Sequence, residues 1–172
     1  MSTLTPRQRI RNVALLCSHA TRNIAYLRAL HERAMAQGQF WKTVDGNFVD
    51  IAALEWCKLF VDGSGKHHWQ KVIDVTQHQA FLPAVFVHAG IDQQKFQDCF
   101  DRVKTYRDKF VAHLDNETVM NIPTMDIVLK SVEHLYSVIR TSNPMWFNGL
   151  PPNMPAYYQQ CEQEANDAWG EE

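Results

Sequence analysis

Seven side chains within residues 6–35 recur at alternating steps of three and four positions, a spacing that puts them on one face of an α-helix. The members of this stripe are Ile10, Val13, Cys17, Ala20, Ile24, Leu27 and His31. Thr5 followed by Pro6 is typical of an N-cap and a first-turn proline, and Gly38 marks the expected end. The sequence therefore predicts one long amphipathic helix, around which the rest of the chain must fold.

Helical signals continue beyond this segment. We expect further helices over residues 47–61, 67–73, 76–89, 92–115, from Pro123 to about Ser142, and 156–169. Pro83 should kink the helix over 76–89, and Gly90 should end it. Asp92 is a suitable N-cap for the next helix, with Ile91 and Phe96 placed as a hydrophobic staple. No segment alternates with the period of a strand, so we expect an all-α fold, a bundle of about five to six helices.

The composition of the chain changes after Ser142. The stretch NPMWFNGLPPNMP, residues 143–155, is rich in proline and aromatic side chains, which is typical of a packed loop. An acidic segment follows from Ala156 to Trp169. We therefore expect a helical bundle over residues 1–142, and a proline-rich loop with a short acidic helix over 143–172 that packs on the same domain.

The length and composition fit one globular domain. The chain has 172 residues, 45% of them hydrophobic and 21% charged, which is enough for a sizeable core. Its longest apolar run, Ala80–Val87, contains a proline and is far too short to cross a bilayer. The N-terminus lacks the pattern of a secretory signal, and the four cysteines lie far apart. We expect a cytoplasmic protein with reduced, mostly buried thiols and no membrane contact.

Common cofactor and metal motifs are missing from the sequence. The eight histidines form neither an H-x-x-x-H nor an H-E-x-x-H pair. The segment GSGK at 63–66 lacks the residues that flank a phosphate-binding loop. The net charge of −2 argues against a general nucleic-acid coat protein. The six arginines in the first 35 residues fit a local basic face, but such clusters are more often an ordinary solvated helix face. We expect no cofactor and no metal.

Arg107 stands where an apolar residue is expected. On a helical wheel Arg107 falls in the middle of an apolar stripe, with Tyr106 and His113 together at its margin. The stripe consists of Phe96, Phe100, Val103, Phe110 and Leu114. A buried guanidinium without a partner is very costly, so Arg107 needs a carboxylate, a polar cleft or a subunit interface. Glu55 in the second helix is a candidate partner. An arginine in such a stripe is more often a structural ion pair than a catalytic residue.

The segment YRDKFVAHLD, residues 106–115, resembles the signature of the HEPN superfamily. That signature is an arginine, a polar residue, a short spacer and a histidine; here Arg107, Asp108 and His113 occupy these places. The wider pattern, with LEWCKLF and HHWQKV upstream, is similar to the abortive-infection branch of the superfamily. The resemblance extends over roughly residues 5 to 140 and implies an all-helical domain.

The resemblance implies a metal-independent endoribonuclease, of a defence or toxin–antitoxin type, whose composite site lies at a homodimer interface. Arg107 would hold the scissile phosphate, His113 would act as general base or acid, and Asp108 would orient Arg107. Residues expected to contribute to binding are Tyr106, Lys109, Asp115 and Glu55. The implied partners are RNA and a protein such as an antitoxin. Many members of the superfamily are not nucleases, so a non-catalytic module that binds a protein or nucleotide partner remains the alternative.

Overall fold

A computed structural model describes residues 4–111 and 123–169, and these residues confirm the all-α prediction. The described segments form six α-helices and contain no strand. The α-helices are α1 (Pro6–Ala36), α2 (Gln39–Phe60), α3 (His78–Ala89), α4 (Gln93–Tyr106), α5 (Asp126–Ser142) and α6 (Met154–Trp169). Short 3-10 turns cover Trp69–Lys71, Val75–Gln77 and Pro144–Trp146, and a π-helical turn covers Arg107–Val111.

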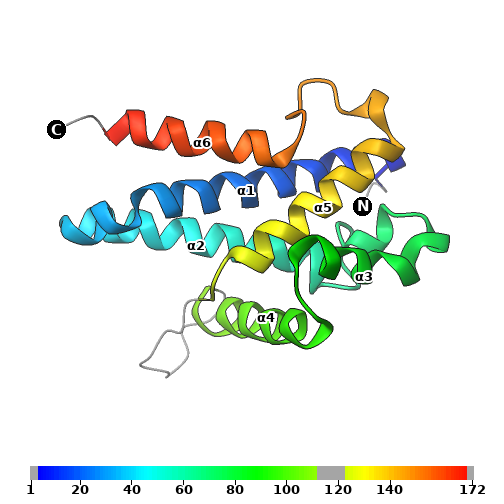
Figure 1. Cartoon of the computed structure of the whole chain (residues 1–172), viewed down its shortest axis with the longest axis horizontal. Coiled ribbons are helices and arrows are strands. Elements are labelled where there is room, and N and C mark those ends of the chain that lie inside the picture. The colour runs from blue at the N-terminus through cyan, green and yellow to red at the C-terminus, as the bar shows by residue number, and fades with distance from the viewer. Residues whose placement is uncertain (1–3, 112–122, 170–172) are drawn as a thin grey trace.

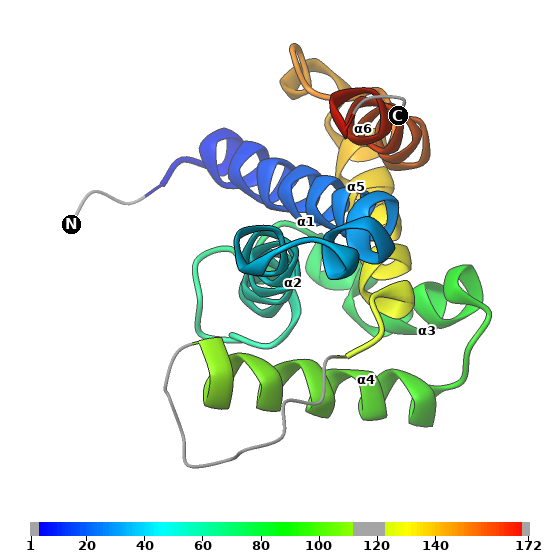
Figure 2. The same ribbon diagram turned by 90° about the vertical axis from the view of Figure 1, so that its left-hand side faces the viewer.

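The long helices α1 and α2 form an antiparallel pair at the centre of the molecule (Figure 1). Helix α6 packs along α1 on the side away from α2, and α5 crosses α1 obliquely (Figure 1). Helix α4 lies beyond α2, at the opposite edge from α6 (Figure 2). The two central helices therefore separate the C-terminal helix from the helix that leads into the RDKFV segment.

Local signals set most helix ends. Thr5 caps α1 through a capping box, in which the Gln8 backbone N–H donates to Thr5 Oγ1 at 3.2 Å and the Thr5 N–H donates to Gln8 Oε1 at 2.9 Å. Gly90 ends α3 with a φ of +66°, a left-handed conformation that favours glycine. Asp92 caps α4, its Oδ1 accepting from the Lys95 backbone N–H at 2.8 Å. These three predictions are confirmed.

Two predicted elements in the first half of the chain differ from the structure. Helix α2 begins at Gln39, not at residue 47, and Gly46 lies inside it. An internal glycine costs only about 1 kcal/mol relative to alanine, which the burial of Val49 on the following turn offsets. The helix expected over 67–73 is a single 3-10 turn, Trp69–Lys71, capped by the side chain of His68.

The core is built around Trp56, which is fully buried on α2. Its ring stacks on Phe60 and contacts Phe96 and Phe100 of α4, at centroid distances between 5.2 and 6.2 Å. Its Nε1–H donates to Ser131 Oγ on α5 at 2.7 Å. Ser131 donates in turn to the Val128 carbonyl at 2.9 Å. One side chain thus connects α2, α4 and α5.

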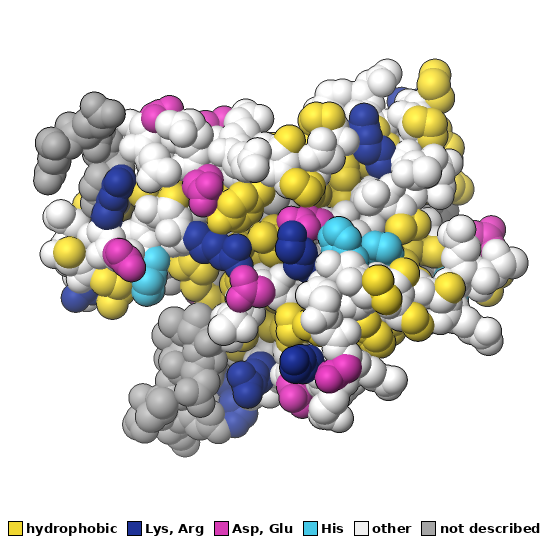
Figure 3. All heavy atoms as spheres, in the orientation of Figure 1, with side chains coloured by type: hydrophobic (Ala, Val, Ile, Leu, Met, Phe, Trp, Pro, Cys, Tyr) yellow, Lys and Arg dark blue, Asp and Glu magenta, His cyan; other side chains and the backbone are white. Residues whose placement is uncertain are grey.

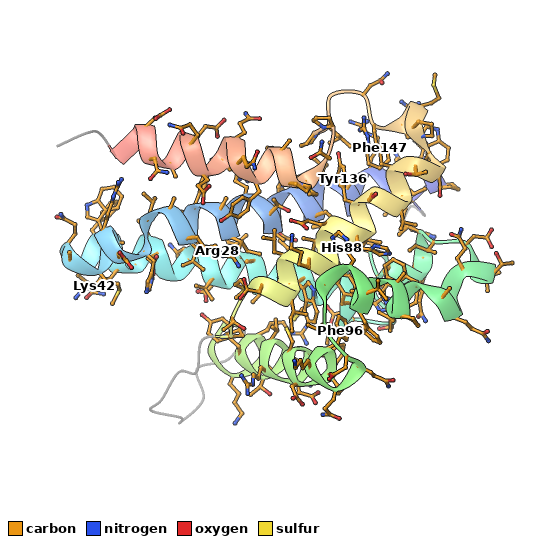
Figure 4. All side chains as sticks on the ribbon, viewed as in Figure 1. Arg28, Lys42, His88, Phe96, Tyr136 and Phe147 are labelled. Atoms are coloured by element: carbon orange, nitrogen blue, oxygen red, sulfur yellow. The ribbon has the colours of Figure 1, made fainter. Side chains whose placement is uncertain are left out.

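The segment after Ser142 packs against α1 and α5. Phe147 is buried and meets the ring of Tyr136 edge-on at 5.3 Å (Figure 4). The Tyr136 hydroxyl donates to the Pro151 carbonyl, and Arg11 of α1 donates to the Trp146 carbonyl at 2.7 Å. Backbone carbonyls of an irregular loop are thereby satisfied by side chains from the bundle.

The four cysteines are buried free thiols, as predicted. Burial raises the pKa of Cys99 to about 11 and that of Cys57 to about 12, so both remain protonated at neutral pH. None of the helices in the described part of the chain is long and apolar enough to cross a bilayer.

The hydrogen bond between Trp56 and Ser131 yields a stability prediction. The Ser131→Ala change leaves the buried indole N–H without its acceptor, and we expect the free energy of unfolding to fall by about 1–3 kcal/mol. The exposed Ser137 lies on the same helix, so Ser137→Ala matches the change in helix propensity and should alter stability by no more than about 0.5 kcal/mol. Urea unfolding followed by tryptophan fluorescence measures both. Equal effects of the two changes would contradict this account.

Candidate functional site

The RDKFV segment interrupts the regular helix. Helix α4 ends at Tyr106, and Arg107–Val111 continue as a π-helical turn. We expected one uninterrupted α-helix over 92–115; within its described part this prediction is wrong from Arg107 onward. A π-helical turn inserts an extra residue per turn and rotates the following side chains relative to an α-helix, and such turns are frequent at functional sites.

Tyr106 belongs to the core and not, as expected, to the margin of the apolar stripe. Its side chain is buried, and its hydroxyl donates to Asp50 Oδ1 on α2 at 2.6 Å. The buried face of α4 consists of Phe96, Cys99, Val103 and Tyr106, so Arg107 lies beside it. Burial and the neighbouring Asp50 raise the pKa of Tyr106 well above its usual range. Tyr106 is therefore a fixed, protonated hydrogen-bond donor that anchors the end of α4 to α2.

Arg107 lies between two carboxylates. Its Nη1 is 2.7 Å from Asp62 Oδ1, in the turn after α2, and its Nε is 2.7 Å from Asp108 Oδ1. The Arg107 side chain is only 16% exposed, whereas the side chains of Asp62 and Asp108 are 42% and 40% exposed. Partial burial would lower the pKa of Arg107, but the hydrogen bonds to Asp62 and Asp108 outweigh it and raise the pKa. The guanidinium is permanently charged and held in one orientation.

Asp108 contacts a second cation in addition to Arg107. Its Oδ2 accepts from Lys104 Nζ, one turn earlier on α4, at 3.0 Å. Partial burial disfavours the ionised carboxyl, but the hydrogen bonds from Lys104 and Arg107 outweigh it and lower the pKa of Asp108. Asp62, Lys104, Arg107 and Asp108 together form a four-residue charge cluster with two positive and two negative groups, so its net charge is zero.

Glu55 is not the partner observed for Arg107. Its carboxylate lies 3.0 Å from Lys58 Nζ on the same helix and 3.9 Å from His19 Nδ1 on α1. The acid that meets Arg107 is Asp62, in the turn after α2, which was not among the predicted partners. The proximity of that turn to α4 is a long-range feature, which helical periodicity alone does not reveal.

The remaining predicted site residues are only partly described. Lys109 lies in the π-helical turn and is partly buried. His113 and Asp115 lie outside the described residues. Of the three predicted catalytic residues, the structure therefore brings Arg107 and Asp108 into contact and leaves the position of His113 untested. No group of three or more His, Cys, Asp or Glu side chains within residues 4–111 and 123–169 is arranged to hold a metal ion.

The two ion pairs of Arg107 yield a second stability prediction. Arg107→Ala leaves Asp62 and Asp108 without a shared cation, but both carboxylates reach solvent, so we expect a loss of about 1–2 kcal/mol rather than the larger loss of a fully buried pair. Arg102→Ala, an exposed position on the same helix, is the control and should change stability by no more than about 0.5 kcal/mol. Denaturant titration measures both. A loss above about 3 kcal/mol would mean that the cluster behaves as a buried structural unit.

Comparison with known proteins gives no independent assignment of the site. No family model, no curated protein and no solved structure matches the chain. The motif and the geometry around Arg107 are therefore the features of the chain that bear on its function.

Proposed function

We propose that the chain is a HEPN-like, metal-independent endoribonuclease of a defence or toxin–antitoxin type, acting in the cytoplasm. The observation that carries the proposal is the fixed guanidinium of Arg107 within the motif R-D-K-F-V-A-H-L-D. A charged side chain that is already oriented loses little conformational freedom when a phosphate binds. A fixed guanidinium therefore binds a scissile phosphate more favourably than a mobile one does.

In this proposal each motif residue has a defined role. Arg107 contacts the non-bridging oxygens of the scissile phosphate and stabilises the negative charge that develops on them. Asp108, 2.7 Å from Arg107 Nε, keeps the guanidinium plane in position. His113 takes the proton of the ribose 2′-hydroxyl or gives one to the leaving 5′-oxygen, roles for which an imidazole suits neutral pH.

The proposed reaction is an internal transfer at phosphorus. The 2′-oxygen forms a bond to the phosphorus as the bond from phosphorus to the 5′-oxygen breaks. The 2′-hydroxyl proton goes to a base, and the 5′-oxygen receives a proton from an acid. The products are a 2′,3′-cyclic phosphate and a 5′-hydroxyl, and no water or metal enters the step.

One observation favours the alternative, a non-catalytic module that binds a protein or nucleotide partner. The charge of Arg107 is already balanced by Asp62 and Asp108, so a phosphate must compete with two carboxylates for the same donors. In a purely structural role, this cluster would tie the end of α4 to the turn after α2. The two functions share the fold and differ in whether His113 does chemistry.

Cleavage assays separate the two functions. We expect the purified protein to cut structured RNA, including tRNA, in the presence of EDTA, and to leave 2′,3′-cyclic phosphate ends. His113→Ala should slow cleavage by about a hundredfold or more, because it removes the proposed acid or base. His19→Ala, at a partly exposed histidine of α1, is the matched control and should cleave like the wild type.

Two results would count against the endoribonuclease. Cleavage that persists unchanged in His113→Ala would come from a contaminant. Absence of cleavage across a broad panel of RNAs, with the oligomeric state intact, would favour the binding module.

The composite site also predicts a homodimer. A cleft formed by one motif from each protomer needs a two-fold interface, the commonest arrangement in oligomers. Light scattering coupled to size exclusion should therefore give about twice the 19.9 kDa chain mass at tens of micromolar. A monomer under these conditions would argue against the shared site without excluding RNA binding by a single chain.

A further inference from the structure

Positive charge gathers where the start of α1 meets the segment after α2. Arg9 of α1 and Lys71 line one cavity of about 600 Å³, and neither forms an ion pair within the described part of the chain. The acid in the same wall is Asp74, whose Oδ1 accepts from the Thr76 backbone N–H at 2.9 Å and from the Thr76 hydroxyl at 2.6 Å. With two cations and one acid, the wall of this cavity carries a net positive charge.

His67 shows that the positive charge continues along the turn after α2. Burial lowers the pKa of its imidazole, and the nearby charges of Lys66, Lys58 and Arg9 lower it further. Lys58 is paired with Glu55 at 3.0 Å, whereas Lys66 is exposed and has no ion pair among the described residues. Three unpaired cations from two segments thus form one basic surface: Arg9, Lys66 and Lys71.

Helix stability does not explain the arginine at this end of α1. The Arg9 backbone N–H donates to the Thr5 carbonyl at 3.0 Å, so Arg9 lies in the opening turns of the helix. The first turn contains no acidic residue. A cation near a helix N-terminus is repelled by the positive end of the helix dipole, and an anion from outside the chain would relieve that repulsion.

The basic surface lies on the same side of the molecule as the RDKFV segment. In Figure 2 the start of α1, the segment after α2 and the end of α4 all lie toward the left of the view. Lys66 is four residues from Asp62, the acid that meets Arg107, so the Cα atoms of Lys66 and Asp62 are at most about 14 Å apart. The face drawn in Figure 3 has a different character, because several of its basic side chains lie against acidic ones. A polyanion held at Arg107 can therefore continue onto the basic surface.

We propose that the basic surface binds the phosphate backbone of RNA, next to the proposed site at Arg107. The choice of RNA rests on the proposed function. Each phosphate that meets a lysine or arginine releases bound counterions, so affinity arises without a fixed spacing of the three cations. Contacts of this kind position a strand and carry no sequence information. The basic surface therefore sets affinity and register, and the chemistry stays at the motif.

An extended polyanion suits this surface better than a small anion. The three cations come from separate positions on two segments, so a single phosphate can meet only one or two of them. A polynucleotide carries a negative charge at every nucleotide and can meet all three along its length.

Binding of a short single-stranded 2′-O-methyl RNA, followed by fluorescence anisotropy, tests the proposal on the full chain. This RNA has no 2′-hydroxyl, so it cannot be cut by the proposed reaction and reports binding alone. We expect the wild type to bind it, with the logarithm of the association constant falling linearly with the logarithm of the salt concentration.

Variants with matched charge locate the contact. Lys66→Gln/Lys71→Gln changes two exposed side chains and should weaken binding by about tenfold or more at low salt, with a salt slope shallower by about 1.4. Arg33→Gln/Lys42→Gln removes the same charge at the other end of the α1–α2 pair, where Figure 4 labels Lys42. Arg33 is about 36 Å from Arg9 along α1, so this control should bind within about twofold of the wild type.

Arg9 needs a separate pair of variants because its Nε is buried. Arg9→Lys keeps the charge and should bind RNA like the wild type. Arg9→Gln removes it and should weaken binding by about fivefold or more at low salt. Thermal melts of both variants show whether a loss of binding is a loss of folding.

Three results would overturn the inference: no binding by the wild type, equal losses in the two double variants, or a salt slope that Lys66→Gln/Lys71→Gln leaves unchanged. Cleavage of unmodified RNA separates this inference from the proposed function. If His113-dependent cleavage proceeds with unchanged KM in Lys66→Gln/Lys71→Gln, the basic surface is wrong and the nuclease stands. If binding needs the basic surface but no RNA is cut, the nuclease is wrong and the surface belongs to a non-catalytic RNA-binding module.

Discussion

The satisfied indole of Trp56 is the constraint on which the rest of the bundle depends. A fully buried tryptophan contributes a large apolar surface, but its N–H must find an acceptor inside the protein. The Ser131 hydroxyl is held by its own hydrogen bond to the Val128 carbonyl. It can therefore accept from the indole only when α5 lies against α2 at the observed position along its axis. The rings of Phe96 and Phe100 then fix α4 on the remaining side of the indole. One hydrogen bond and two ring contacts of the same indole thus align three helices.

The alignment of α4 determines the geometry of the motif. Tyr106 ties the last turn of α4 to Asp50, and the next residue, Arg107, reaches Asp62 beyond the end of α2. Adjacent residues therefore contact Asp50 within α2 and Asp62 in the turn after it, and the π-helical turn begins where these two contacts diverge. This anchoring makes Arg107 rigid, and rigidity is useful both for phosphate binding and for structure. The two proposed functions are consequently hard to tell apart from Arg107 alone, and His113 is the residue that distinguishes them.

The fold was predictable from the sequence where local rules decide it. Thr5 with Gln8, Asp92 and Gly90 act within a few residues of the chain, and each marks a helix end in the structure. The start of α2 was missed because Gly46 weakens a local signal that the buried side chains around it override. Within the site, Arg107 and Asp108 are neighbours in sequence and were predicted to act together. Asp62 and Asp50 reach α4 from elsewhere in the chain, and no periodicity encodes such pairings. The burial of Asp45, whose Oδ1 has no hydrogen-bond partner among the described residues, is likewise known only from the structure.

The position of α6 has a consequence for how the chain folds during its synthesis. Thr21 on α1 donates from its hydroxyl to the sulfur of Met154 at the start of α6, across 133 positions of sequence. The N-terminal part of a chain emerges from the ribosome first. Helices α1 and α2 can therefore associate while the face of α1 that α6 covers is still exposed to solvent. Thr21 of α1 and Cys161 of α6, both buried in the folded protein, are shielded only after α6 has left the exit tunnel. A nascent chain halted before Met154 would therefore expose to chaperones and proteases the face of α1 that α6 covers, including Thr21.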